Sequence, residues 1–142
     1  MDLREDAYIP ESYITVHDMR MLAYKKVAAV SNEAEADDLV DEFTDRFSDP
    51  PLQVLSLISV SLIKSLAEQV KICEITENPT AVNFYYFAAK DLNFEKISEI
   101  NSEFRGQIMV LSGNKPGFSW RMNPEGKKNK LSNIKKILQM LK

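Results

Sequence analysis

Hydrophobic residues recur at helical spacing through the first half of the chain. The predicted helices cover residues 19–30, 33–47 and 51–70. The third begins after Asp49 with Pro51 in its first turn, a typical helix start because proline has no N–H to leave unpaired there. Its apolar residues cover well over half of the helical circumference, which is typical of a helix buried in a core. Lys64, Glu68 and several serines interrupt the apolar run, so we predict a core helix rather than a membrane span.

After residue 70 the pattern changes to that of strands. The predicted strands cover residues 71–77, 81–88, 107–111 and 118–122. The second is apolar on both faces, so we expect it at the centre of a sheet. Asn93 is predicted to cap a short helix with Phe94, Ile97, Ile100 and Phe104 on one side. Residues 123–126 are predicted to be a loop, and apolar positions from Leu131 onward indicate a final amphipathic helix.

The order of these elements predicts an α/β fold of the α+β kind. A three-helix segment with a long central core helix comes first. Two hairpin-like strand pairs then form a small mixed sheet, with a short helix between them and a helix at the C-terminus. Residues 1–17 lack helical periodicity but carry Tyr8, Ile9, Tyr13 and Ile14, which indicates an extended arm that lies on another surface. Residues 18–142 are expected to form a single domain. Pairing of the arm with a second copy of the chain is an open alternative.

The charge and the cysteine and histidine content limit the kinds of partner and site that this chain can have. The net charge of −3 is too small to indicate a nucleic-acid partner by itself. The single cysteine, Cys73, excludes an internal disulfide and fits a cytoplasmic protein, and we expect no signal peptide. His17 is the only histidine, so neither a zinc site nor a His-dependent nucleophile is expected. The Ser112–Gly117 turn has glycines and a lysine but lacks the ending of a phosphate-binding loop. We therefore expect no catalytic residue, cofactor or metal.

Basic residues gather in the last quarter of the chain. They are Lys115, Arg121, Lys127, Lys128, Lys130, Lys135 and Lys136. Phe118 and Trp120 could supply stacking surfaces for bases, although two aromatic residues on one strand face ordinarily pack into a core. A nucleic-acid-binding appendage is therefore the alternative function.

The second predicted helix has a charged face that stands out. Glu42, Asp45 and Arg46 lie at i, i+3 and i+4, so their side chains meet on one exposed face. An arginine held among carboxylates presents a fixed guanidinium, which suits docking to a partner that carries arginines and a carboxylate. The same spacing equally suits an internal Glu–Arg pair worth about 0.3–0.5 kcal/mol.

Two motifs resemble those of one bacterial family. DAYIPESYI at Asp6–Ile14 and LVDEFTDRFSDPPLQVLSL at Leu39–Leu57 resemble segments of the C-terminal module of the transcription-repair coupling factors, Mfd. In that family the arm reads much like D-A-Y-I-P-x-x-Y-I. The helix reads L-x-x-E-(L/F)-x-D-R-F-G-x-x-P and is followed by a long apolar helix. The similarity extends over about residues 6–75, and the later strands agree only in pattern.

The resemblance implies a regulatory module without catalysis of its own. The parent protein is implied to be an ATP-driven, Mg-dependent DNA translocase that removes stalled RNA polymerase and recruits UvrA, and residues 1–17 would be the linker from its motor. The module is implied to pack on the UvrB-like module of the same chain, which would hide the UvrA-docking surface. The implied contact residues match Glu42, Asp45 and Arg46, and we add Asp38 and Asp41 by proximity. ATP and Mg would belong to the motor, and DNA and polymerase to other modules.

Two residues depart from the family pattern. Ser48 follows the D-R-F motif where the family usually has glycine, and Lys71 stands where glycine tends to end the long helix. If either position requires a positive φ, the side chain adds strain on the order of 1 kcal/mol.

Overall fold

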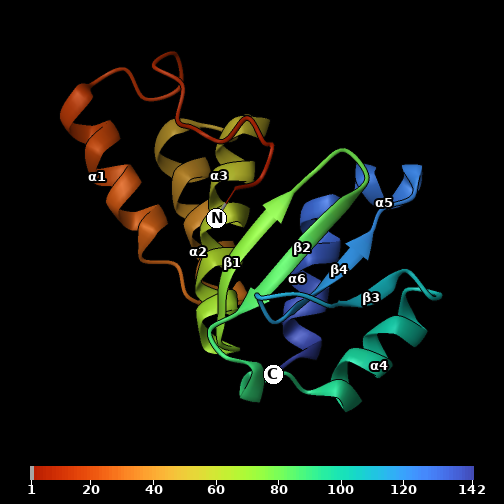
Figure 1. The fold of residues 1–142 in the computed structure, drawn as a ribbon. Coiled ribbons are helices and arrows are strands. Elements are labelled where there is room, and N and C mark those ends of the chain that lie inside the picture. Colours follow the sequence, from red (N-terminus) through yellow and green to blue (C-terminus); the bar gives the residue numbers. More distant parts are fainter. Residues whose placement is uncertain (1) are drawn as a thin grey trace. The chain divides into compact units, whose positions relative to one another are not determined.

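The computed structural model describes residues 2–142 and divides them into two compact units, each described here by itself. One unit comprises residues 5–66, and the other comprises residues 67–142 together with residues 2–4. The first three helices are α1 (His17–Ala28), α2 (Glu33–Phe47) and α3 (Leu52–Gln69) (Figure 1). They confirm the three predicted N-terminal helices. The division into an arm, residues 1–17, and one domain, residues 18–142, stays a prediction.

The arm of the unit 5–66 lies against the helices of that unit. Ile9 and Ile14 are only 3% and 2% exposed, which confirms that this segment covers a surface. The backbone N–H of Ile9 donates to the Tyr24 hydroxyl at 2.9 Å. The Tyr13 hydroxyl donates to the carbonyl of Ser48 at 2.7 Å, and burial raises the pKa of this phenol, with a further contribution from Asp49.

Side-chain hydrogen bonds fix both ends of the loop between α1 and α2. The Asn32 side chain accepts from the backbone N–H of Glu35 at 2.9 Å and so caps α2. The Ser31 hydroxyl donates to the Glu35 carboxylate at 2.7 Å. From α3, the hydroxyls of Ser61 and Ser65 donate to the carbonyls of Val27 and Val30, each at 2.7 Å.

The unit 67–142 contains a four-stranded sheet. Its strands are β1 (Ile72–Glu77), β2 (Ala81–Tyr86), β3 (Ile108–Leu111) and β4 (Gly117–Arg121), in the order β1-β2-β4-β3. The position of β2 inside the sheet confirms the prediction of a central strand. All three pairings between these strands are antiparallel, so the expected mixed sheet is wrong in that detail. The parallel element is one isolated bridge between Asp2 and Thr76.

The remaining helices belong to the same unit. They are the 3-10 helix η1 (Ala89–Asp91), α4 (Phe94–Glu103), α5 (Pro124–Lys128) and α6 (Lys130–Met140). On the apolar side of α4, Ile97 and Ile100 are buried, whereas Phe94 is 62% exposed. The expected loop at residues 123–126 is also wrong, because α5 begins there with its backbone capped by Asn123. The fold class, helices followed by a sheet with interspersed helices, is confirmed.

The core of this unit is aromatic. The Phe84 and Phe118 rings stack with centroids 4.8 Å apart, and Trp120 is fully buried. Gly117 is required by close approach of two strands, because a Cβ there would lie 2.1 Å from the carbonyl oxygen of Phe84. Burial raises the pKa of the Tyr86 phenol to about 12.

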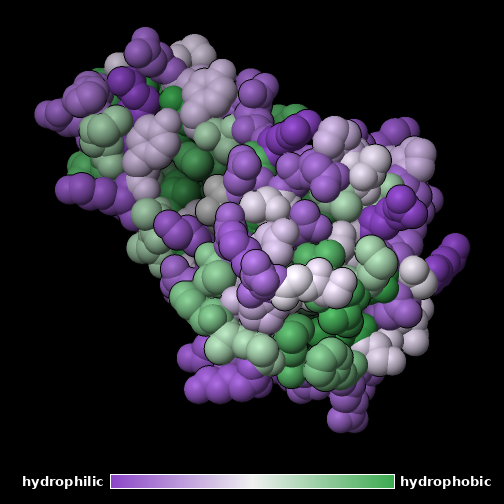
Figure 2. Space-filling model, in the orientation of Figure 1, coloured by the Kyte–Doolittle hydropathy of each residue, from purple (hydrophilic) through white to green (hydrophobic). Residues whose placement is uncertain are grey.

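The surface mixes polar and apolar residues. Figure 2 shows hydrophobic residues in green among hydrophilic residues in purple, and exposed apolar side chains occur in both units. Within residues 2–142, no helix combines the length and the apolar character needed to cross a membrane.

Candidate docking surface

The α2 helix places apolar side chains on one side and acidic side chains on the other. Ala36, Leu39 and Phe43 are buried at helical spacing. The charged residues of this helix are Glu33, Glu35, Asp37, Asp38, Asp41, Glu42, Asp45 and Arg46. Seven carboxylates and one guanidinium therefore lie on a helix of 15 residues, which makes α2 a strongly anionic element.

The structure keeps the predicted contact residues at the surface. We call Asp38, Asp41, Glu42, Asp45 and Arg46 the acidic face. Glu42 is partly exposed and the other four are exposed. A nitrogen of the Arg46 guanidinium lies 3.6 Å from Glu42 Oε2, and the guanidinium also lies over the Phe47 ring at 5.0 Å. These two contacts hold the arginine side chain as the sequence argument required, while the docking role of the acidic face stays a prediction.

Lys26 of α1 adds a cation that the sequence argument missed. Its ammonium forms a hydrogen-bonded ion pair with the same oxygen of Glu42 that faces Arg46. This hydrogen bond is the main reason that the pKa of the Glu42 carboxyl lies below its ordinary value, with both neighbouring cations contributing as well. Lys26 and Glu42 lie 16 residues apart on different helices, so no local spacing rule could have found the pair.

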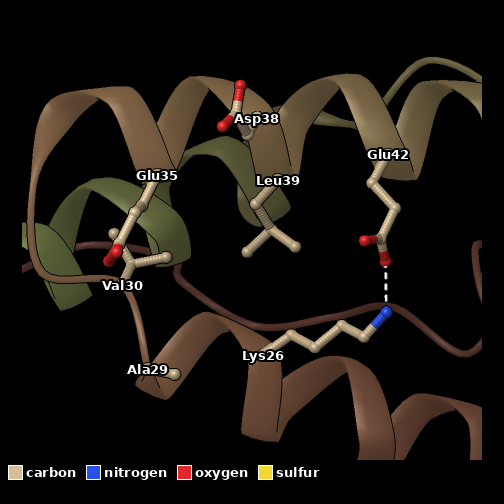
Figure 3. Close-up of a pocket in the computed structure, with 7 residues that line it drawn as sticks. All are labelled: Lys26, Ala29, Val30, Glu35, Asp38, Leu39 and Glu42. Carbon is tan, nitrogen blue, oxygen red and sulfur yellow. Dashed lines mark hydrogen bonds and ion pairs between the residues drawn. The ribbon is translucent and has the colours of Figure 1, made fainter.

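A groove with an apolar floor runs beside this ion pair, between the end of α1 and the first half of α2 (Figure 3). Its volume is about 360 Å³, and it is lined by Lys26, Ala29, Val30, Glu35, Asp38, Leu39 and Glu42. In the close-up, Glu42 points toward α1 and meets Lys26, whereas the Asp38 carboxylate points away from α1.

A second, smaller cavity of about 110 Å³ lies on the other side of the ion pair. It is lined by Met19, Leu22, Ala23, Lys26, Phe43, Arg46 and Phe47. Lys26 therefore borders both cavities, and acidic residues line only the larger one.

The structure gives little support to the nucleic-acid alternative. Trp120 and Phe118 are fully buried, so neither offers a surface for base stacking. Three lysines of the basic quarter are held in internal ion pairs: Lys115 with Glu74, Lys130 with Glu77 and Lys136 with Glu103. Among residues 2–142, no group of three or more His, Cys, Asp or Glu side chains is arranged to hold a metal ion.

Comparisons with known proteins agree on one family. The family model described as "TRCF domain" matches residues 3–102. The transcription-repair-coupling factor of Bacillus subtilis (strain 168) is 32% identical over 132 residues, 93% of this chain and 10% of that protein. The factor of Haemophilus influenzae is 32% identical over 90 residues, 63% of this chain and 8% of that protein. The chain thus spans about a tenth of the length of the curated relatives it matches.

A solved structure has the same fold. It is described as the crystal structure of the C-terminal domain of transcription-repair coupling factor, and it superposes with a TM-score of 0.89. The match covers 99% of this chain and 89% of the other, at 18% sequence identity. At that identity, the likeness establishes the fold.

Proposed function

This chain belongs to the TRCF domain family, the C-terminal domain of transcription-repair coupling factors, and we propose that it is a non-catalytic docking module. In this proposal the acidic face packs on the UvrB-like module of the same protein and covers the surface that recruits UvrA. ATP and Mg act in the motor of the parent protein, and other modules contact DNA and RNA polymerase.

The observation that carries the proposal is that the acidic face is exposed and that its arginine side chain is held in place. Asp45 and Arg46 are exposed, and Arg46 is held in place by Glu42 and by the Phe47 ring. A fixed guanidinium between carboxylates can bind a carboxylate while its neighbours bind arginines, which gives the contact both register and charge selectivity.

Exposed charges also suit a contact that must be released. Charged groups at the solvent-accessible part of an interface raise the association rate and fix the partner, but salt screens them. A contact carried by the acidic face should therefore weaken steadily with salt, and it should open when another protein competes for the partner.

The first test is charge reversal in the full-length factor. Glu42→Lys and Asp45→Lys should leave the domain folded and increase UvrA binding, because they replace attraction to a basic partner by repulsion. Asp37→Lys is the matched control: it makes the same charge change about 140° around the helix from Glu42. UvrA binding would be measured by titration at low and moderate salt. Reversals that bind UvrA no better than the control would show that the acidic face is not the docking surface.

A second test measures the contact directly. The 142-residue chain is titrated with the UvrB-like module of the same parent protein across a range of salt concentrations. We expect binding that weakens with salt and is lost with Glu42→Lys and Asp45→Lys. Salt-independent binding would contradict a charge-based contact.

A further inference from the structure

We propose that Lys26 is an internal competitor of the docking partner, because its ammonium holds the Glu42 carboxylate that a basic group of the partner has to take over. This inference rests on the proposed function and adds a specificity-determining residue to it. The partner group is a guanidinium or ammonium at the end of a long side chain, since the site it enters is a carboxylate already matched to one.

The geometry at Glu42 shows the competition. Lys26 and Arg46 both approach Oε2 of this carboxylate, Lys26 from α1 and Arg46 from the next turn of α2. Two cations on one carboxylate offset the negative charge that would attract a third. Asp45 and Asp38 keep exposed carboxylates without such a partner among the contacts of residues 2–142, so Glu42 is the neutralised member of the acidic face.

The ion pair between Lys26 and Glu42 is also exposed enough to dissociate. Its side chain is 43% exposed and that of Glu42 is 38% exposed, so water can replace each partner at small cost. The ammonium is a point charge on a flexible stem, whereas a guanidinium can bind a carboxylate through two parallel hydrogen bonds. A partner arginine can therefore displace Lys26 from Glu42, and Lys26 can return when the partner leaves.

Displacement changes the shape of the surface as well as its charge. Lys26 borders the two cavities between α1 and α2, one with an acidic rim and one lined mainly by apolar residues and Arg46. Movement of its side chain away from Glu42 therefore changes the lining of both cavities. An apolar side chain next to the partner's basic group could then contact Val30 and Leu39, which form part of the groove floor.

The expected effect is a modest weakening of docking. Exposed ion pairs contribute an amount that corresponds to about a twofold to fivefold change in an equilibrium constant. Lys26 would lower the affinity for the partner by that factor and so keep the contact releasable.

The experiment compares two lysines of the same helical turn. Lys26→Gln removes the competing charge and keeps most of the stem, whereas Lys25→Gln makes the same charge change at an exposed residue away from Glu42. Each 142-residue variant is titrated with the UvrB-like module of the parent protein. Lys26→Gln should bind about twofold to fivefold tighter than Lys25→Gln. In a Glu42→Gln background, the two lysine variants should bind equally.

A second readout does not depend on docking. The pKa of Glu42, followed by NMR, should rise toward its ordinary value in Lys26→Gln and stay low in Lys25→Gln. Binding by Lys26→Gln that is equal to or weaker than that of Lys25→Gln overturns the inference, the weaker case making Lys26 a direct contact. If Glu42→Lys and Asp45→Lys also bind normally, the proposed function itself has failed.

Discussion

At the scale of single residues, two non-glycine residues have backbone conformations that favour glycine. Ser48 has φ 89° and ψ −178°, a region that glycine occupies and other residues avoid, and Lys71 has φ 66° in the left-handed region. Both are positions where the family pattern has glycine. The condition set by the sequence analysis, a positive φ, is met at both positions, and the strain follows from the Cβ atom.

Replacing either residue by glycine should stabilise the chain. Strain at such positions costs about 1–3 kcal/mol, and glycine gives back about 0.5–1 kcal/mol through the entropy of the unfolded chain. Ser48→Gly and Lys71→Gly should therefore each raise the free energy of unfolding by about 1 kcal/mol, measured by urea denaturation. Glycine at Ser48 keeps the carbonyl that accepts from Tyr13.

Alanine variants separate strain from side-chain loss. Ser48→Ala and Lys71→Ala shorten the side chain but keep Cβ, so neither should gain stability. A stabilisation by alanine equal to that by glycine would mean that the positive φ is not the cause.

Residue-scale reasoning also has a clear limit at Lys26. The sequence predicted the Glu42–Arg46 pair because helical spacing alone brings i and i+4 together. The Lys26–Glu42 pair depends on how α1 and α2 approach each other, which no spacing rule on one helix describes.

At the scale of elements, the errors share a physical cause. Proline and glycine at residues 124–126 favoured a loop, yet Asn123 followed by Pro124 is also a helix start, and α5 uses it as one. Phe94 shares the apolar side of its helix with Ile97 and Ile100 but is exposed, because it is the first residue of α4, where a side chain can lie beyond the packed surface. The antiparallel pairing and the order β1-β2-β4-β3 depend on register between distant strands, which composition does not encode.

The serines of α3 have a structural role that their polarity alone did not indicate. In the sequence they argued against a membrane span. In the fold Ser61 donates to the carbonyl of Val27 in the last turn of α1, and Ser65 donates to the carbonyl of Val30 in the loop that follows. The Val27 carbonyl also accepts from the backbone N–H of Val30 at 3.2 Å, so the Ser61 hydroxyl adds a second donor at a helix end, where intrahelical partners run out. Helices α1 and α3 are thereby tied together within the unit 5–66.

Removing these hydroxyls should weaken that tie. Ser61→Ala and Ser65→Ala should each lower the free energy of unfolding by about 0.5–1.5 kcal/mol, the usual contribution of one hydrogen bond. Thermal or urea denaturation would measure it. Ser102→Ala, at an exposed helical position in α4, controls for the higher helix propensity of alanine and should be neutral or slightly stabilising. Equal behaviour of all three variants would contradict the role assigned to the α3 serines.

At the scale of the whole molecule, charges fall into an exposed set and a buried set. The net charge of −3 gave no hint of this division. Lys26, Glu42 and Arg46 pair at the surface, with side chains that are 43%, 38% and 48% exposed. Glu77 and Lys130 pair at 2.8 Å with side chains only 3% and 7% exposed. The exposed set can exchange partners, whereas the buried set can only hold its neighbours in place.

The buried pair joins three distant parts of the chain. Glu77, at the end of β1, accepts from the backbone N–H of Arg4 at 2.8 Å, and Lys130, at the start of α6, donates to the carbonyl of Arg4 at 3.1 Å. Residues 2–4 are thereby fixed to the sheet unit before the chain enters the unit 5–66. We expect this pair to be essential for folding and unrelated to docking.

Lys130→Met tests that division. It leaves the Glu77 carboxylate buried without its cation and should lower the free energy of unfolding by about 3–5 kcal/mol. Lys136→Met is the matched control on the same helix, since Lys136 pairs with Glu103 where both side chains are about half exposed, and it should cost far less than Lys130→Met. Urea denaturation at low and high salt would compare them, and adding Glu77→Gln to Lys130→Met should recover part of the loss because the uncompensated charge is removed. Equal losses of unfolding free energy in the two lysine variants would contradict the division of the charges by burial. The acidic face could then not be distinguished as the set of charges that exchanges partners.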